Sequence, residues 1–172
     1  DSALDFDPKS GRTATHSAQA ILVAAREEGV SIDWLLETHA HADHLSAAAY
    51  LKEKLGGRTG VGDHITEVQE IFGRIFNAGA TFATDGRQFD HLFAEGETFS
   101  TGSLTFTVMH TPGHTPACLS YLVTDGEETV VFVGDTLFMP DTGTARCDFP
   151  GGDARTLYRS IRRLLALPAQ TK

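Results

Sequence analysis

The segment THAHADH, residues 38–44, places three histidines and one aspartate within six positions, directly after the run IDWLLE, which predicts a short buried strand. Side chains two positions apart at the end of a strand point to the same side, so His39 and His41 face one point. Asp43 and His44 follow where the chain turns. Imidazole nitrogen and carboxylate oxygen are common ligands of zinc and iron. Without a metal, imidazoles this close would repel one another when protonated, so the pattern favours a metal site over a solvated loop.

Two other segments carry metal-compatible groups at the ends of predicted strands. MHTPGHTPA, residues 109–117, follows an alternating strand and places His114 in a turn shaped by glycine and proline. VVFVGDTLF, residues 130–138, places Asp135 just beyond a buried apolar strand, where open sheets present ligand-binding groups. A single Gly-Asp pair is commonly only a turn. Three such segments in one short chain are a much more specific signal.

Helical and strand patterns are mixed along the chain. The first 17 residues are polar and are predicted to be a loop, and Asp125-Gly126 predicts a hairpin. The last helix is expected to begin at the cap residue Asp153 and to bury Leu157, Ile161, Leu164 and Leu165. The other predicted helices are 17–28, 45–57 and 65–76, and the predicted strands are 32–38, 104–110, 117–124 and 129–135. The mixture predicts the α/β or α+β class.

Composition limits the classes of function. A chain of 172 residues with 41% hydrophobic residues suits one domain, residues 1–172, with its own core. A net charge of −9 argues against a nucleic-acid partner, and no apolar stretch is long enough to predict a membrane span. The two cysteines, Cys118 and Cys147, form no CxxC pair, so we expect a reducing, cytoplasmic compartment. The oligomeric state is left open.

The motifs THAHADH, TPGHT and GDTLF together resemble the metallo-β-lactamase superfamily over nearly the whole chain. The resemblance implies an α/β fold, a four-layer αββα sandwich with a metal site at one edge of its two sheets. It also implies metal sites built from residues already named. The first site would comprise His39, His41 and His114, the second would comprise Asp43 and His44, and Asp135 would bridge the two.

The chain departs from the family pattern at both ends. Relatives have strands before the position of Asp1, and a later strand with one more histidine. The remaining His16, His64 and His91 lie in polar or loop contexts and are expected at the surface. We therefore expect a fragment of a longer domain, without its outer N- and C-terminal strands.

The stretch DTGTARCDFPGGDARTLYRSIRRLLALP, residues 141–168, resembles the persulfide dioxygenases, which oxidise glutathione persulfide to sulfite with O2. The wider layout also resembles glyoxalase II, which hydrolyses glutathione thioesters. Both resemblances imply a small-molecule thiol substrate, whose carboxylates suit an arginine such as Arg146. The alternative for Arg146 is a loop-stabilising ion pair with Asp148 or Asp153.

The two activities differ in their metals. For the dioxygenase, His39, His114 and Asp135 would surround one Fe(II) ion, with His41, Asp43 and His44 orienting that shell. For the hydrolase, one or two Zn²⁺ ions would activate water, with Asp43 and His44 as true ligands. We expect the dioxygenase, with Asp43, His44 and Arg146 acting beside the metal. A metal-binding module without catalysis is the third alternative.

Overall fold

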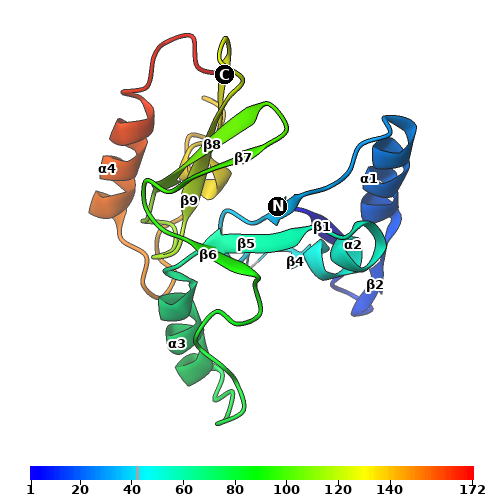
Figure 1. Ribbon diagram of the computed structural model, residues 1–172. Helices are drawn as coiled ribbons and strands as arrows, with labels where there is room; N and C mark the ends of the chain where they lie inside the picture. The colour runs from blue at the N-terminus through cyan, green and yellow to red at the C-terminus, as the bar shows by residue number, and fades with distance from the viewer. Residues whose placement is uncertain (42) are drawn as a thin grey trace.

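A computed structural model describes residues 1–41 and 43–172 and contains three sheets (Figure 1). The first two sheets are parallel β3-β5-β6 and antiparallel β10-β9-β8-β7, and a small antiparallel sheet has the order β2-β1-β4. The strands are β1 (Ala3–Asp7), β2 (Arg12–Ala14), β3 (Trp34–Leu36), β4 (Leu45–Ser46), β5 (Arg58–Gly62), β6 (His91–Phe93), β7 (Thr98–Thr101), β8 (Leu104–His110), β9 (Leu119–Thr124) and β10 (Thr129–Phe132). The helices are α1 (His16–Glu27), α2 (Ala48–Leu55), α3 (Ile65–Ile75), α4 (Ala154–Leu164) and the short 3₁₀ turn η1 (Gly134–Thr136).

The sheets β3-β5-β6 and β10-β9-β8-β7 pack on each other through an aromatic core. Phe93 of β6 is 1% exposed, and its ring centroid lies 4.7 Å from Phe99 of β7 and 6.0 Å from Tyr121 of β9. Val108 of β8 is fully buried in the same cluster, and Trp34 of β3 packs against it. These contacts fix the relative position of the two sheets, because close-packed rings tolerate little displacement.

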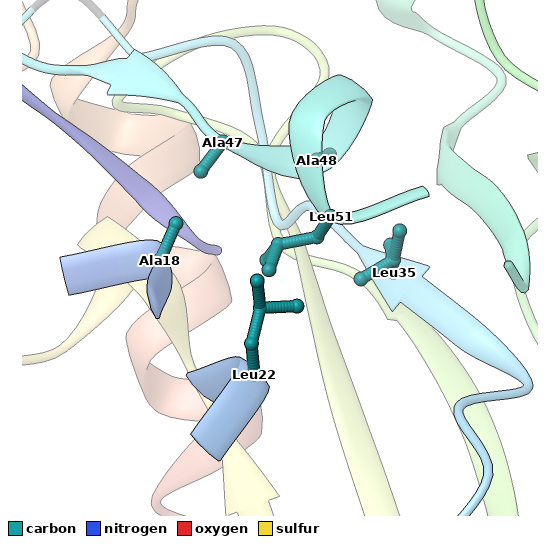
Figure 2. Close-up of a cluster of buried hydrophobic side chains, with 6 residues drawn as sticks. All are labelled: Ala18, Leu22, Leu35, Ala47, Ala48 and Leu51. Atoms are coloured by element: carbon teal, nitrogen blue, oxygen red, sulfur yellow. The ribbon is translucent and has the colours of Figure 1, made fainter. Parts of the chain in front are cut away.

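Helices cover the outer sides of both sheets. Apolar side chains of α1 and α2 meet the β3 strand in a second core (Figure 2), which is formed by Ala18, Leu22, Leu35, Ala47, Ala48 and Leu51. On the other side of the molecule, α4 runs beside the β8–β9 sheet (Figure 1). The order helix, sheet, sheet, helix confirms the α/β sandwich expected from the sequence. None of the helices in the described part of the chain is long and apolar enough to cross a bilayer.

Several predicted boundaries are wrong. The first residues form β1 and β2 rather than a loop, joined by a turn in which the Asp7 carboxylate accepts from the Lys9 amide and the Ser10 hydroxyl. The second predicted helix begins later, at Ala48, because Leu45–Ser46 pairs with β1. Such short strands are stabilised by distant partners and leave little periodicity in the sequence.

The last helix begins as predicted, since the Asp153 carboxylate accepts from the Thr156 amide at 2.7 Å. Its predicted apolar face is correct for Leu157 and Leu164, which are 4% exposed, and wrong for Leu165, which is 61% exposed. The helix ends at Leu164, so the next side chain lies on the wall of a surface groove instead of in the core.

Besides β1, β2 and β4, three further strands were not predicted, namely β5, β6 and β7. The β5 sequence RTGVG contains two glycines and no alternation, yet Thr59 to Gly62 are buried. A Cβ atom on Gly60 would lie 2.5 Å from the Phe93 ring, so glycine is required where the core ring crosses the strand. That requirement exists only in the folded protein.

Gly113 provides a test of the packing beside α4. Its φ is +139°, and a Cβ atom would lie 2.3 Å from Leu157 Cα, so Gly113→Ala adds a steric clash to an unfavourable backbone conformation. We expect the free energy of unfolding to fall by roughly 2–5 kcal/mol. Chemical denaturation followed by circular dichroism measures the change.

The matched control is Gly102→Ala. Gly102 also has a positive φ, +55°, but no atom lies within 4 Å of the added Cβ. This variant should lose only about 1–2 kcal/mol, the backbone cost alone. Equal losses in the two variants would show that α4 does not pack against the segment around Gly113 as described.

Candidate metal centre

Three segments that are distant in sequence meet at one edge of the two sheets. They are residues 38–41 and 43–44 after β3, residues 111–118 between β8 and β9, and η1 after β10. Strands β8 and β10 both pair with β9 in antiparallel fashion, so their carboxyl ends lie at the same edge. The Leu119 amide donates to the Thr38 carbonyl at 2.9 Å, which links the first segment to the second sheet.

His39 is the most buried side chain of the centre, at 1% exposure. Its Nδ1 atom lies 3.0 Å from the Thr38 hydroxyl, and that hydroxyl donates to the Asp1 carboxylate at 2.8 Å. The other ring nitrogen, Nε2, is buried and has no hydrogen-bond partner among the described residues. The ring is therefore anchored on one side and presents an unpaired nitrogen on the other.

His114 and Asp135 complete an inner group around that nitrogen. The Asp135 Oδ2 atom lies 3.8 Å from His39 Nε2 and 3.5 Å from His114 Nε2. The Nδ1–H of His114 donates to the Arg146 carbonyl at 2.6 Å, which leaves Nε2 directed to the centre. One ligand atom from each of the three residues lies within 4.8 Å of the others.

Gly134 lets η1 approach this closely. Its φ is +50°, and a Cβ atom would lie 2.5 Å from the Thr38 hydroxyl oxygen. Any side chain at this position would push Asp135 away from the His39 ring. The Gly-Asp pair thus places a carboxylate against a buried histidine.

The donor set suits a bound cation. Burial, reinforced by the neighbouring imidazoles of His41 and His114, lowers the pKa of His39 to about 3, so its ring is neutral at physiological pH. A neutral imidazole with a free lone pair is a good ligand for a transition metal. A buried nitrogen without a partner costs free energy unless a ligand uses it. The inner group therefore has the chemistry of a zinc or iron site.

Three more metal-compatible residues of the motif, His41, Asp43 and His44, form a group of their own beside the inner group. His41, Asp43 and His44 bring one ligand atom each within 4.8 Å of one another, and the rings of His41 and His44 have centroids 3.9 Å apart. His41 also belongs to a third group, with Asp1 and Glu37. The ring centroids of His39 and His41 are 4.0 Å apart. That His41 joins His39 and His114 as a metal ligand stays a prediction.

A cavity of about 440 Å³ opens onto the inner group, lined by Asp43, His114, Asp135, Phe138, Ala145, Arg146 and Phe149. The Phe149 ring packs edge-on against His114, and the Arg146 guanidinium lies 5.0 Å from the centre of the Phe149 ring. A larger groove of about 790 Å³ shares Phe138 with this cavity but none of the histidines. The smaller cavity is therefore the one that a reacting molecule would enter.

Arg146 forms the ion pair that the sequence offered as one alternative. Its Nε and Nη2 atoms donate to the two Asp148 carboxylate oxygens at 2.6 and 2.8 Å. These bonds hold the Asp148 pKa below its usual range. They use two of the five guanidinium N–H donors, so a role in binding substrate carboxylates stays a prediction.

Sequence reasoning missed Glu37 and Asp1, whose carboxylates lie behind His41. Glu37 looked like part of a strand, and a buried glutamate has no sequence signature. Among the histidines expected at the surface, His16 is exposed, whereas His91 lies in β6 and contacts Glu97 and Trp34.

Comparison with known proteins identifies the family of the chain. The profile of the metallo-beta-lactamase superfamily matches residues 5–171. A probable metallo-hydrolase of Burkholderia pseudomallei is 58% identical over 178 residues, which cover 100% of this chain and 60% of the relative. Glyoxylase B2 of Dictyostelium discoideum is 49% identical, with 100% and 58% covered, and the mitochondrial persulfide dioxygenase ETHE1 of Mus musculus is 30% identical, with 91% and 51% covered. The chain thus spans between about half and three fifths of the length of these three relatives.

A solved structure also resembles the chain. The crystal structure of ETHE1 from Myxococcus xanthus superposes with a TM-score of 0.68 at 28% identity, and the match covers 97% of this chain and 65% of that one.

Asp135 is the residue whose loss should weaken metal binding most clearly. Asp135→Ala removes the carboxylate of the inner group, and we expect metal affinity to fall by at least about 100-fold, the upper range for a lost outer-shell partner. Competition with a chromogenic chelator measures the affinity. Asp141→Ala, which removes an exposed carboxylate from the larger groove, should bind metal like the wild type. Unchanged affinity in Asp135→Ala would contradict the assignment of the centre.

Proposed function

The chain belongs to the metallo-beta-lactamase superfamily, and we propose that it is a persulfide dioxygenase of that family. The reaction converts a glutathione-type persulfide and O2 into sulfite, so that RSSH + O2 + H2O gives RSH + SO3²⁻ + 2H⁺. The observation that carries the proposal is the composition of the inner group, which contains two histidines and one carboxylate. This donor set is typical of non-haem Fe(II) oxygenases.

An Fe(II) ion held by His39, His114 and Asp135 would supply the redox chemistry. The protein residues around it have separate tasks. Thr38 and the Arg146 carbonyl orient the two imidazole rings through Nδ1, so that both Nε2 atoms point inward. Phe149 packs against His114 and limits access of water to that side of the centre.

The cavity suits a thiol that carries a carboxylate. The rings of Phe138 and Phe149 provide apolar walls next to the inner group, where a sulfur chain can pack. Arg146 lies on the same wall and retains donors beyond those that bind Asp148. We infer that Arg146 binds a substrate carboxylate while the terminal sulfur reaches the metal.

The second candidate is a glyoxalase II-type hydrolase of glutathione thioesters. Two observations favour it, namely the relatives named as a metallo-hydrolase and as a glyoxylase, and the neighbouring group of His41, Asp43 and His44. Two Zn²⁺ ions would then lower the pKa of a shared water to about 7. The activity thus depends on whether the metal is iron or zinc, and on whether the centre binds one ion or two.

An oxygen electrode separates the two activities. The purified full-length protein, loaded with Fe(II), should consume O2 when glutathione persulfide is added and should produce sulfite in equal amount. Asp135→Ala should abolish this uptake. No oxygen uptake, together with hydrolysis of a glutathione thioester, would favour the hydrolase. Neither activity in a protein that binds metal would identify a metal-binding module without catalysis.

Asp43 gives a second contrast between one metal and two. If Asp43 only orients the inner shell, Asp43→Ala should lower kcat/KM by about 10- to 100-fold, the usual effect of an outer-shell residue. If Asp43 binds a second ion, the loss should be much larger and the metal content should fall as well. Steady-state kinetics and elemental analysis measure both, with Asp141→Ala as the control that leaves both unchanged.

A further inference from the structure

Three fully buried hydroxyl groups adjoin the inner group, and the proposed function uses none of them. They belong to Thr111, which directly follows β8, to Ser120 of β9 and to Thr136 of η1. All three side chains are closed off from water, at 0% exposure. A buried hydroxyl costs free energy unless it forms hydrogen bonds, so these groups have to be paired within the fold.

The hydroxyls bind one another across the three segments. The Thr136 hydroxyl donates to Thr111, whose carbonyl and hydroxyl oxygens each lie 3.2 Å away. The Thr111 and Ser120 hydroxyl oxygens are 2.9 Å apart. The Thr111 amide also donates to the Cys118 carbonyl at 2.9 Å, which closes the loop that carries His114. Thr136 thus ties η1 to the loop of His114.

Asp135 depends on such a tie, because its own carboxylate is weakly held. Among the described residues, this carboxylate forms ion-pair contacts only with the imidazoles of His39 and His114, at 3.8 and 3.5 Å, which exceed the length of a normal hydrogen bond. The direction of the carboxylate therefore follows from the backbone of η1. That backbone is fixed on one side of Asp135 by the close packing of Gly134 and on the other side by the Thr136 hydroxyl.

We propose that Thr136 is a positioning residue: its hydroxyl holds η1 so that the Asp135 carboxylate stays opposite the two imidazoles, and it thereby raises the affinity of the centre for a metal ion. The inference rests on the proposed function only in its metal centre, and it applies equally to a dioxygenase and to a hydrolase. If Thr136 merely filled space in the core, valine, which has nearly the same shape without the hydroxyl, would serve as well. The hydroxyl itself is therefore the group to test.

Metal titrations of the full-length apoprotein test the inference. The affinity for Zn²⁺ is measured by competition with a chromogenic chelator for the wild type, Thr136→Val and Thr136→Ser. We expect Thr136→Val to bind the ion about 10- to 100-fold more weakly, the usual effect of a lost outer-shell partner, and Thr136→Ser to recover most of that loss. Wild-type affinity in Thr136→Val, or equal weakening in the two variants, would overturn the inference.

A second pair of variants applies if Thr136→Val does not fold. Thr136→Ala and Thr136→Ser differ by a single oxygen atom, and both keep the bond from the Thr144 hydroxyl to the carbonyl of residue 136, which is 2.8 Å long. Thr136→Ala should bind Zn²⁺ at least about tenfold more weakly than Thr136→Ser, because only the serine variant can still donate to Thr111. Equal affinity in this pair would refute the role of the hydroxyl.

Thr59→Val is the matched control for a general effect on folding. Thr59 lies in β5 and is also buried, and its hydroxyl donates to the Asp90 carboxylate at 2.9 Å, outside the metal centre. Its Zn²⁺ affinity should equal that of the wild type. The visible absorption of the Co(II)-loaded proteins reports the ligand geometry, so Thr136→Val should show shifted bands and Thr59→Val should show wild-type bands. Unshifted bands in Thr136→Val, or the same shift in Thr59→Val, would count against the positioning role.

Oxygen uptake by the same proteins separates the two proposals. If Thr136→Val loses metal affinity as expected, but the Fe(II)-loaded wild type consumes no O2 with glutathione persulfide, the positioning role stands and the dioxygenase assignment fails. If the wild type consumes O2 while Thr136→Val binds metal as tightly as the wild type, the assignment stands and the role of Thr136 fails.

Discussion

The burial of His39 is the constraint on which the rest of this site depends. A ring at 1% exposure cannot exchange its missing hydrogen bond for water, so its free Nε2 needs a partner supplied by the fold or by a ligand. The surrounding chain is built to keep that nitrogen available. Thr38 binds the other ring nitrogen, and Gly134 removes the side chain that would displace Asp135. The local structure thus leaves the buried His39 Nε2 atom as a preformed ligand position.

The arrangement of carboxylates gives the centre its chemical character. Asp135 lies on the side of the cavity, where its charge can neutralise a bound cation, and it is 30% exposed. The buried carboxylate of Glu37 and the more exposed carboxylate of Asp1 lie 3.6 and 3.1 Å from the His41 Nε2 atom. Carboxylates next to a cluster of imidazoles strengthen the binding of a cation.

Much of the fold and the site followed from local patterns. The alternation of Leu104, Phe106 and Val108 predicted β8, and Asp153 marked the start of α4, because these signals depend on neighbours within a few residues. The β1–β2 hairpin and the glycine-rich β5 were missed, since their stability comes from distant partners. Leu165 was placed in the core wrongly, because a helical pattern continues in sequence after the helix itself has ended.

The sequence by itself determined which residues could bind metal, since the types and spacing of His39, His114 and Asp135 at strand ends express the ligand chemistry directly. Only the tertiary structure decided how those residues are grouped. It placed two histidines and one carboxylate together. It also brought His41 next to Glu37, a residue that local spacing assigned to a strand. The physical reason is that spacing along one strand fixes the direction of a side chain, whereas burial and partners from other strands fix what that side chain meets.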